Sequence, residues 1–253
     1  MKFNHLTFAI LSLLLIQHSS CKKSNSNPAT SGSTDKIMLY IEDASQTVAN
    51  EIDTFTVAYD DQDRILSLNN PKVKTVYTYG AGNSFSMDLY TFGTWNIHEN
   101  YFLNSSSLVD STLQFNNTND TTSEGYTFSG GKLVTKREYN YSAITGSQLE
   151  DQDDYTYDNN GNMIKDINTD MYGEVNAISN YTYTDKLFST LILPKYINIL
   201  AKYLPATLTQ LDGYGNVNLS ITYSYQFDNK GRLVKDTETY NDGEVVVKSY
   251  VYY

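Results

Sequence analysis

This sequence of 253 residues offers few groups for thiol or imidazole chemistry. It has one Cys and three His, and only His98 lies beyond the first twenty residues. Zinc needs three or four His, Cys or carboxylate ligands, and a Ser-His-Asp triad would have to use His98, which has no nucleophile elbow nearby. We therefore predict no catalytic residues and no metal site, and interpret His98 as an ordinary strand residue.

Acidic residues cluster at positions 60–63 and 151–154. Calcium binds oxygen ligands, but neither cluster has the alternating acids, central Gly and distant Glu of an EF-hand loop, so we interpret both as turn-capping and solubilising. No glycine-rich phosphate loop precedes a helix, and we expect no cofactor. A carboxylate pair that cleaves glycosidic bonds remains an alternative, because a sequence does not show which acids face each other.

Aromatic residues are the stronger indication of binding. The stretch from Tyr90 to Phe102 holds five rings in thirteen residues. Most should lie in the core, but rings on an exposed sheet face can stack on sugars. We select Tyr90 and Trp95 as candidate ligand-stacking residues, with a glycan or another envelope protein as the partner.

The composition favours strands and excludes one class of partner. With 18 basic and 29 acidic side chains the formal charge is −11, which argues against nucleic acid, because phosphate binding depends on clustered Lys and Arg. The 23 Tyr and 10 Phe suit pleated, half-buried strands better than helices.

Residues 1–20 read as an export signal. Lys2 precedes an apolar run of eleven residues, Leu6 to Ile16, which is typical of a signal peptide and too short to span a membrane. Cys21 follows directly. Removing residues 1–20 would leave 17 basic and 29 acidic side chains, a charge of −12.

The segment 17–21 resembles a bacterial lipobox, although His18 stands where an aliphatic residue is usual. This resemblance implies that Cys21 carries acyl groups, so that the chain contacts a membrane through this anchor. We expect residues 22–35 to be a flexible tether. The predicted location is the bacterial cell envelope, as an outer-membrane lipoprotein whose periplasmic or surface orientation stays open. The alternative is an ordinary signal peptide followed by a free thiol.

Period-two alternation dominates from residue 36 onward. From Val217 to Phe227 every second residue is apolar and the residues between are polar, which predicts a strand. Similar runs occur at 85–89, 175–183 and 245–253. We predict a single all-β domain over 36–253.

One supersecondary unit is present twice. Residues 158–175 align without a gap to residues 228–245, with nine identities in eighteen positions. Each copy predicts a turn, a strand and a second turn, with the first turn built by an Asp cap and a Gly at positive φ. These structural turn residues are Asp158, Gly161, Asp228 and Gly231. The result is an antiparallel meander, with weaker copies at 57–66 and 126–134.

The repeated aromatic-x-Tyr-Asp-x-x-Gly-Arg-Leu pattern resembles the YD repeat of Rhs-type extracellular shells. Residues 181–185, 204–207 and 228–233 are similar to Bacteroidetes-type lipoproteins of unknown function with a porin-like fold. That resemblance implies a barrel-like or strongly curved sheet and an envelope location, but no activity.

Two features qualify this architecture. Helical spacing after Pro194 predicts one short amphipathic helix within 187–204. Alternation also fits an outer-membrane barrel, but Arg137, in the row Leu133-Thr135-Arg137-Tyr139, would then meet lipid.

We therefore predict a cell-envelope lipoprotein that is a non-enzymatic binding or structural module. The alternatives are a carbohydrate-binding or glycan-acting surface lipoprotein and an outer-membrane barrel.

Overall fold

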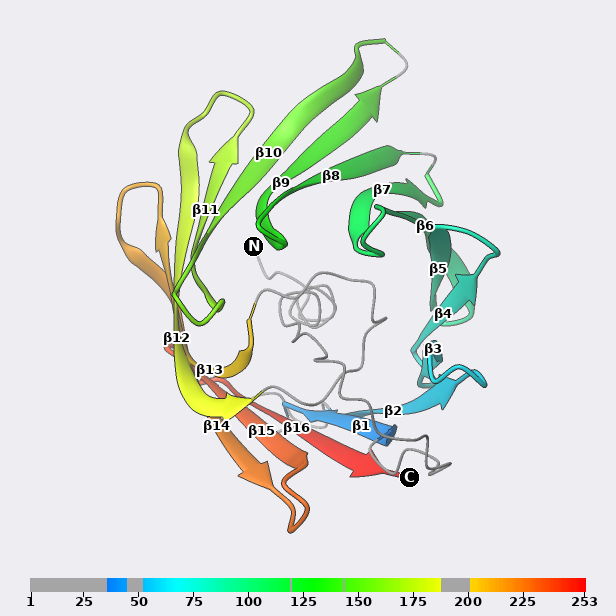
Figure 1. Ribbon diagram of the computed structural model, residues 1–253, viewed down its shortest axis with the longest axis vertical. Coiled ribbons are helices and arrows are strands. Elements are labelled where there is room, and N and C mark those ends of the chain that lie inside the picture. Colours follow the sequence, from blue (N-terminus) through cyan, green and yellow to red (C-terminus); the bar gives the residue numbers. More distant parts are fainter. Residues whose placement is uncertain (1–35, 45–51, 119, 143, 188–200) are drawn as a thin grey trace.

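A computed structural model describes residues 36–44, 52–118, 120–142, 144–187 and 201–253. Within these residues sixteen strands form a closed antiparallel barrel (Figure 1). The strands are β1 (Ile37–Asp43), β2 (Ile52–Tyr59), β3 (Ile65–Asn69), β4 (Val73–Tyr79), β5 (Ser84–Thr91), β6 (Thr94–Leu103), β7 (Val109–Asn116), β8 (Thr121–Ser129), β9 (Lys132–Ser142), β10 (Gly146–Tyr157), β11 (Met163–Asp170), β12 (Val175–Leu187), β13 (Tyr203–Asp212), β14 (Val217–Phe227), β15 (Leu233–Tyr240) and β16 (Val245–Tyr252).

The topology is an up-and-down meander. Each strand pairs with its neighbours in the chain, and β16 closes the ring by pairing with β1, where Tyr40 lies opposite Tyr250 and Glu42 opposite Lys248. Closure leaves no sheet edge, so the backbone polar groups of every strand have a neighbouring strand on both sides. The predicted all-β meander is confirmed as a closed barrel.

The period-two pattern of the sequence becomes the two faces of the wall. In β14, Ile221 and Tyr223 lie on the more buried face, while Thr222 and Ser224 are exposed. Strand partners share a face, so Leu208 of β13 and Tyr240 of β15, which lie opposite Ile221, continue the same side.

The buried face is the inner one. Side chains on the concave side of a closed wall converge, so those from strands that do not pair can meet. Tyr126 of β8 packs against the cluster that contains Tyr77 of β4 and Tyr101 of β6. Aromatic and aliphatic side chains of this cluster form the larger core: Ile37, Tyr40, Val57, Ile65, Leu68, Tyr77, Phe85, Tyr101 and Val109.

The outer face carries hydroxyl and amide side chains together with apolar ones, such as Leu39 and Ile41 of β1 and Leu113 and Phe115 of β7. Its exposed residues on β2, β4, β12 and β14 include Thr54, Thr56, Thr78, Asn180, Thr182, Asn218, Thr222, Ser224 and Gln226. Thr135 and Arg137 of β9 also lie on this face, where they contact Asp154 and Gln152 of β10 at 2.7 and 2.8 Å.

The two copies of the duplicated unit have the same turn geometry. Asp158 Oδ1 accepts the backbone N–H groups of residues 160 and 162 at 2.9 and 2.8 Å, and Gly161 has φ +91°. Asp228 Oδ1 does the same for residues 230 and 232, with Gly231 at φ +78°. In the weaker copy after β2, Asp63 takes the left-handed conformation at φ +63°.

Tyrosines at the end of the second strand of a hairpin bond back to the first strand. In several of the described hairpins a Tyr hydroxyl donates to a backbone carbonyl near the start of the preceding strand. The pairs include Tyr79 to Ile65, Tyr157 to Leu133, Tyr183 to Met163, Tyr225 to Pro205 and Tyr252 to Leu233, at 2.5 to 2.8 Å. The guanidinium groups of Arg64 and Arg232 also lie over the rings of Tyr79 and Tyr252. We call these tyrosines hairpin latches. They account for part of the tyrosine excess in the composition.

The helix predicted within 187–204 is wrong at both ends. Leu187 is the last residue of β12, and Tyr203 and Leu204 begin β13, because pairing with neighbouring strands overrides the local helical spacing. Residues 188–200, which hold the rest of that prediction, lie outside the described residues. In the part of the chain that the structure describes, no helix is long and apolar enough to cross a membrane.

Removing one latch hydroxyl should destabilise the barrel. In Tyr225→Phe the carbonyl of Pro205, which is buried, loses its donor, and we expect the free energy of unfolding to fall by about 1–2 kcal/mol in a denaturant titration. Tyr214→Phe is the matched control, because Tyr214 lies 95% exposed at a turn. Equal stability of the two variants would show that the latch contributes nothing.

Candidate binding site on the outer wall

Four outward side chains form a row across β3 to β6. Asn69 lies opposite Lys74, Lys74 opposite Tyr90, and Tyr90 opposite Trp95. Because neighbouring strands lie about 4.8 Å apart, the row spans about 14 Å. The predicted stacking residues Tyr90 and Trp95 are thus adjacent on the outer wall, and the structure adds an amide and an ammonium group to them.

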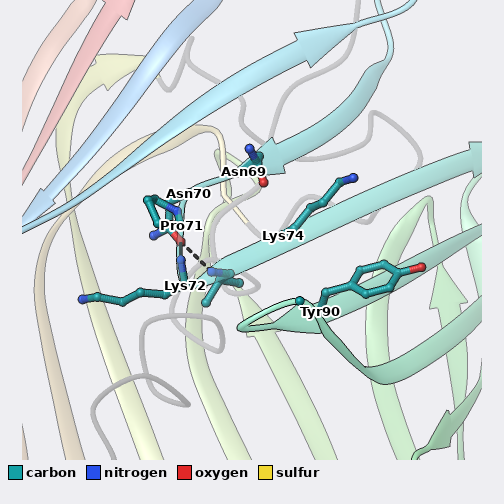
Figure 2. Close-up of a pocket in the computed structure, with 8 residues that line it drawn as sticks. Asn69, Asn70, Pro71, Lys72, Lys74 and Tyr90 are labelled. Carbon is teal, nitrogen blue, oxygen red and sulfur yellow. Dashed lines mark hydrogen bonds between the residues drawn. The ribbon is translucent and has the colours of Figure 1, made fainter.

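A pocket of about 450 Å³ opens at this row (Figure 2). It is lined by Asn69, Asn70, Pro71, Lys72, Val73, Lys74, Tyr90 and Gly93. In Figure 2 the ring of Tyr90 and the side chain of Lys74 extend from neighbouring strands, and Lys72 extends away from both. The lining is polar and cationic around one aromatic ring.

The turn between β3 and β4 lines the pocket, and hydrogen bonds from Asn70 fix its conformation. Asn70 is buried, and its Oδ1 accepts the backbone N–H groups of Lys72 and Val73 at 2.8 and 2.5 Å. Lys72 Nζ reaches Asp53 Oδ1 on β2 at 2.9 Å. The Lys74 side chain is exposed, and no ion pair joins it to any residue that the structure describes.

A strained residue stands beside this pocket. Phe92 and Gly93 connect β5 to β6 in a two-residue turn, with φ +50° and +77°. Positive φ at both positions is typical of a type I′ turn, which favours Asn-Gly. A Phe in the left-handed region costs about 1–2 kcal/mol. The Phe92 N–H donates to the Lys72 carbonyl at 2.6 Å, and its side chain is 73% exposed.

Phe92 was not selected from the sequence, where it was one of five rings in the stretch 90–102. The sequence feature that could have identified Phe92 is the Phe-Gly pair at turn positions that usually hold Asn-Gly. The structure divides those rings between the two faces: Tyr101 is buried in the interior, whereas Phe102 is 42% exposed on the outer wall. Strain at an exposed apolar residue favours a role in binding.

Hydrogen bonds fix the orientation of Trp95. Its Nε1 donates to Asp88 Oδ1 at 3.2 Å, and the same oxygen contacts His98 Nδ1 at 2.8 Å. His98 Nε2 lies 3.2 Å from Asn100 Oδ1, so both ring nitrogens of this strand residue have partners. Asp88 and His98 therefore act on the site by positioning the indole.

The barrel interior concentrates acids among tyrosines. Inward-facing carboxylates are Glu42, Asp53, Glu99, Glu124, Glu138, Asp151, Asp153, Asp166, Asp236 and Glu238. Tyr40 and Tyr101 donate their hydroxyls to Glu42 and Glu99, two residues along the same strand, at 2.5 and 2.6 Å. Two inward lysines join this network: Lys136 contacts Glu124 and Asp153, and Lys248 contacts Glu238.

Desolvation dominates the electrostatics of these acids. Burial raises the pKa of Glu99, Glu138, Asp166 and Asp236 to about 7 in each case. Neighbouring carboxylates add to the effect, Asp153 on Asp166 and Glu124 on Glu138. Asp166 and Asp236 each have one buried carboxylate oxygen that no described residue hydrogen-bonds.

No set of three His, Cys, Asp or Glu side chains among the described residues is placed to hold a metal ion. A second pocket of about 400 Å³ has Asp158 and Asp185 in its lining. Both oxygens of Asp158 are bonded within its own turn, and Asp185 is highly exposed beside Lys186. This pair does not have the environment of a general acid and its base partner.

Known structures with this architecture are porin-like proteins. The chain is similar to a porin-like protein from Bacteroides vulgatus, with a TM-score of 0.63, 10% identity, and coverage of 87% of this chain and 99% of that one. It is also similar to a porin-like protein from Bacteroides uniformis, with a TM-score of 0.59, 13% identity, and coverage of 87% and 98%. Neither protein-family models nor curated proteins give a match. At these identities the likeness shows the fold alone: this is a porin-like β-barrel.

The interior acids predict an unusual dependence of stability on pH. Asp166 has a folded pKa of about 7 against an ordinary value of 3.8. Between these values the folded state holds a proton that the unfolded state has released, so the free energy of unfolding falls as pH rises through that window. We expect denaturant titrations to give higher stability near pH 5 than near pH 8.

Asp166→Asn should flatten that slope and raise the stability at pH 8, because the amide cannot ionise. Asp61→Asn, at an exposed turn position, should leave the slope unchanged. A wild-type stability that increases steadily from pH 5 to pH 8 would contradict the assignment of buried, protonated carboxyls.

Proposed function

We propose that this protein is a bacterial outer-membrane lipoprotein, anchored through Cys21, whose barrel stands outside the bilayer as a non-enzymatic, glycan-binding module. The observation that supports a barrel outside the lipid is the polar outer face of β14. A transmembrane barrel presents an apolar band about 25 Å tall to lipid. Here the outer face of β14 is Asn218, Ser220, Thr222, Ser224 and Gln226.

Strand length and outward charge support the same proposal. A membrane-spanning strand needs about 9–11 residues. β1, β3 and β4 have seven, five and seven residues. Arg137 and Lys74 are on the outer face of β9 and β4, where a cation near the bilayer midplane would cost about 2–4 kcal/mol.

Removing the anchor tests the location of the barrel. We expect the Cys21→Ala protein to appear in the aqueous fraction without detergent and to unfold cooperatively, whereas wild type partitions with the outer membrane. Palmitate labelling of wild type but not of Cys21→Ala would support the lipid anchor. A Cys21→Ala barrel that dissolves only in detergent would contradict our proposal and favour a membrane-embedded barrel.

The row on β3 to β6 supports a glycan as the ligand. Sugar rings present an apolar face and a polar edge, and the site offers the rings of Tyr90 and Trp95 beside the donors of Asn69 and Lys74. A few convergent polar groups around aromatic surface are typical of ligand sites. The length of about 14 Å suits several sugar units in sequence rather than a single one.

Phe92→Asn tests the site without damage to the fold. Because Asn is favoured in this turn, the variant should be more stable than wild type by about 1 kcal/mol. We expect it at the same time to bind glycans more weakly on an array, because it lacks the exposed ring. Tyr172→Asn is a matched control, since Tyr172 is 82% exposed at the turn before β12. Higher stability with unchanged glycan binding would show that Phe92 takes no part in the site.

A further inference from the structure

We propose that the glycan held by this site carries carboxylate groups, and that Lys74 is the residue that selects them. The inference rests on the proposed glycan-binding function and specifies its ligand class. It is based on the position of the Lys74 ammonium group, which lies between the amide of Asn69 and the ring of Tyr90 in one cross-strand row.

Lys74 is exposed on the outer wall, and no residue that the structure describes pairs with its charge. The other cation of the pocket, Lys72, is paired with Asp53. The pocket lining holds no acidic residue. Because the formal charge of the chain is −11, the overall composition does not explain a pocket that is lined by lysines and no acids.

The geometry matches a charged sugar. A ring stacked on Tyr90 has Lys74 one strand away, about 4.8 Å along the row, within reach of a carboxylate on that sugar or the next. Asn69, a further strand away, can donate to a hydroxyl. Asp88, an outward carboxylate two residues before Tyr90 on β5, accepts a hydrogen bond from Trp95 and contacts His98. Lys74 therefore supplies the positive charge of the row.

The competing occupant is a neutral glycan, for which stacking and hydrogen bonds suffice. In that case Lys74 would contribute one hydrogen bond of ordinary strength and no dependence on ionic strength. An ionic contact at an exposed site instead weakens as salt increases. The charge of the ligand and the dependence of binding on salt concentration therefore distinguish a carboxylated glycan from a neutral one.

The test uses the anchored protein's Cys21→Ala form on an array in which each carboxylated glycan is paired with its methyl ester. Polygalacturonate and its methyl ester are one such pair, identical in sugar and linkage. We expect tighter binding to the carboxylate form by about five-fold, a preference that shrinks at high salt. Lys74→Gln should abolish the preference, so that the carboxylate form and its methyl ester bind equally well. Lys165→Gln, on the outer face of β11 across the barrel, is the matched control and should keep the preference.

The other outcomes contradict either this inference alone or both the inference and the proposed function. Equal binding to both members of each pair, or a carboxylate preference that survives in Lys74→Gln, would overturn this inference while the glycan-binding function stands. Binding to no glycan of either kind would overturn both. In that case the Cys21→Ala fractionation still decides separately whether the barrel lies outside the lipid.

Discussion

The pairing of β16 with β1 is the constraint on which the rest of this structure depends. It joins strands more than 190 residues apart in the chain and removes both edges of the sheet. Once the wall is closed, every strand has a concave and a convex face, and alternation along the strand distributes side chains between them. The side chains of Tyr40 and Tyr250 meet inside the closing pair, with ring centroids 5.7 Å apart.

Closure also explains the unusual chemistry of the interior. Inward carboxylates converge and lose solvent, and the fold offsets this through tyrosine hydroxyls and two lysines rather than by excluding acids. Burial that raises the pKa of Glu99 and Asp236 to about 7 is the remaining cost. The outer wall differs from the interior, with the hydroxyl and amide groups of strands such as β14 beside outward apolar side chains such as Leu113 and Phe115.

Local features of the fold were predictable because they depend on contacts within one hairpin. The strand at 217–227 and the meander follow from period-two alternation and turn residues, whereas the barrel-like curvature was implied by the resemblance to porin-like lipoproteins; the structure confirms all three. The prediction of a helix within 187–204 failed at Leu187 and Tyr203, since spacing over a few residues does not include the pairing that forms β12 and β13. Phe92 was missed for a related reason, because positive φ at an aromatic residue is decided by the register of β5 and β6.

By itself the sequence determined the strand period and the duplicated turn units, and it predicted an export signal over residues 1–20 and Tyr90 and Trp95 as aromatic candidates. Only the tertiary structure decided which face of each strand points inward, since alternation is symmetric between an apolar interior and an apolar exterior. It also decided that Asn69, Lys74, Tyr90 and Trp95 form one row. Register between strands is a property of the closed sheet, and no single strand contains it.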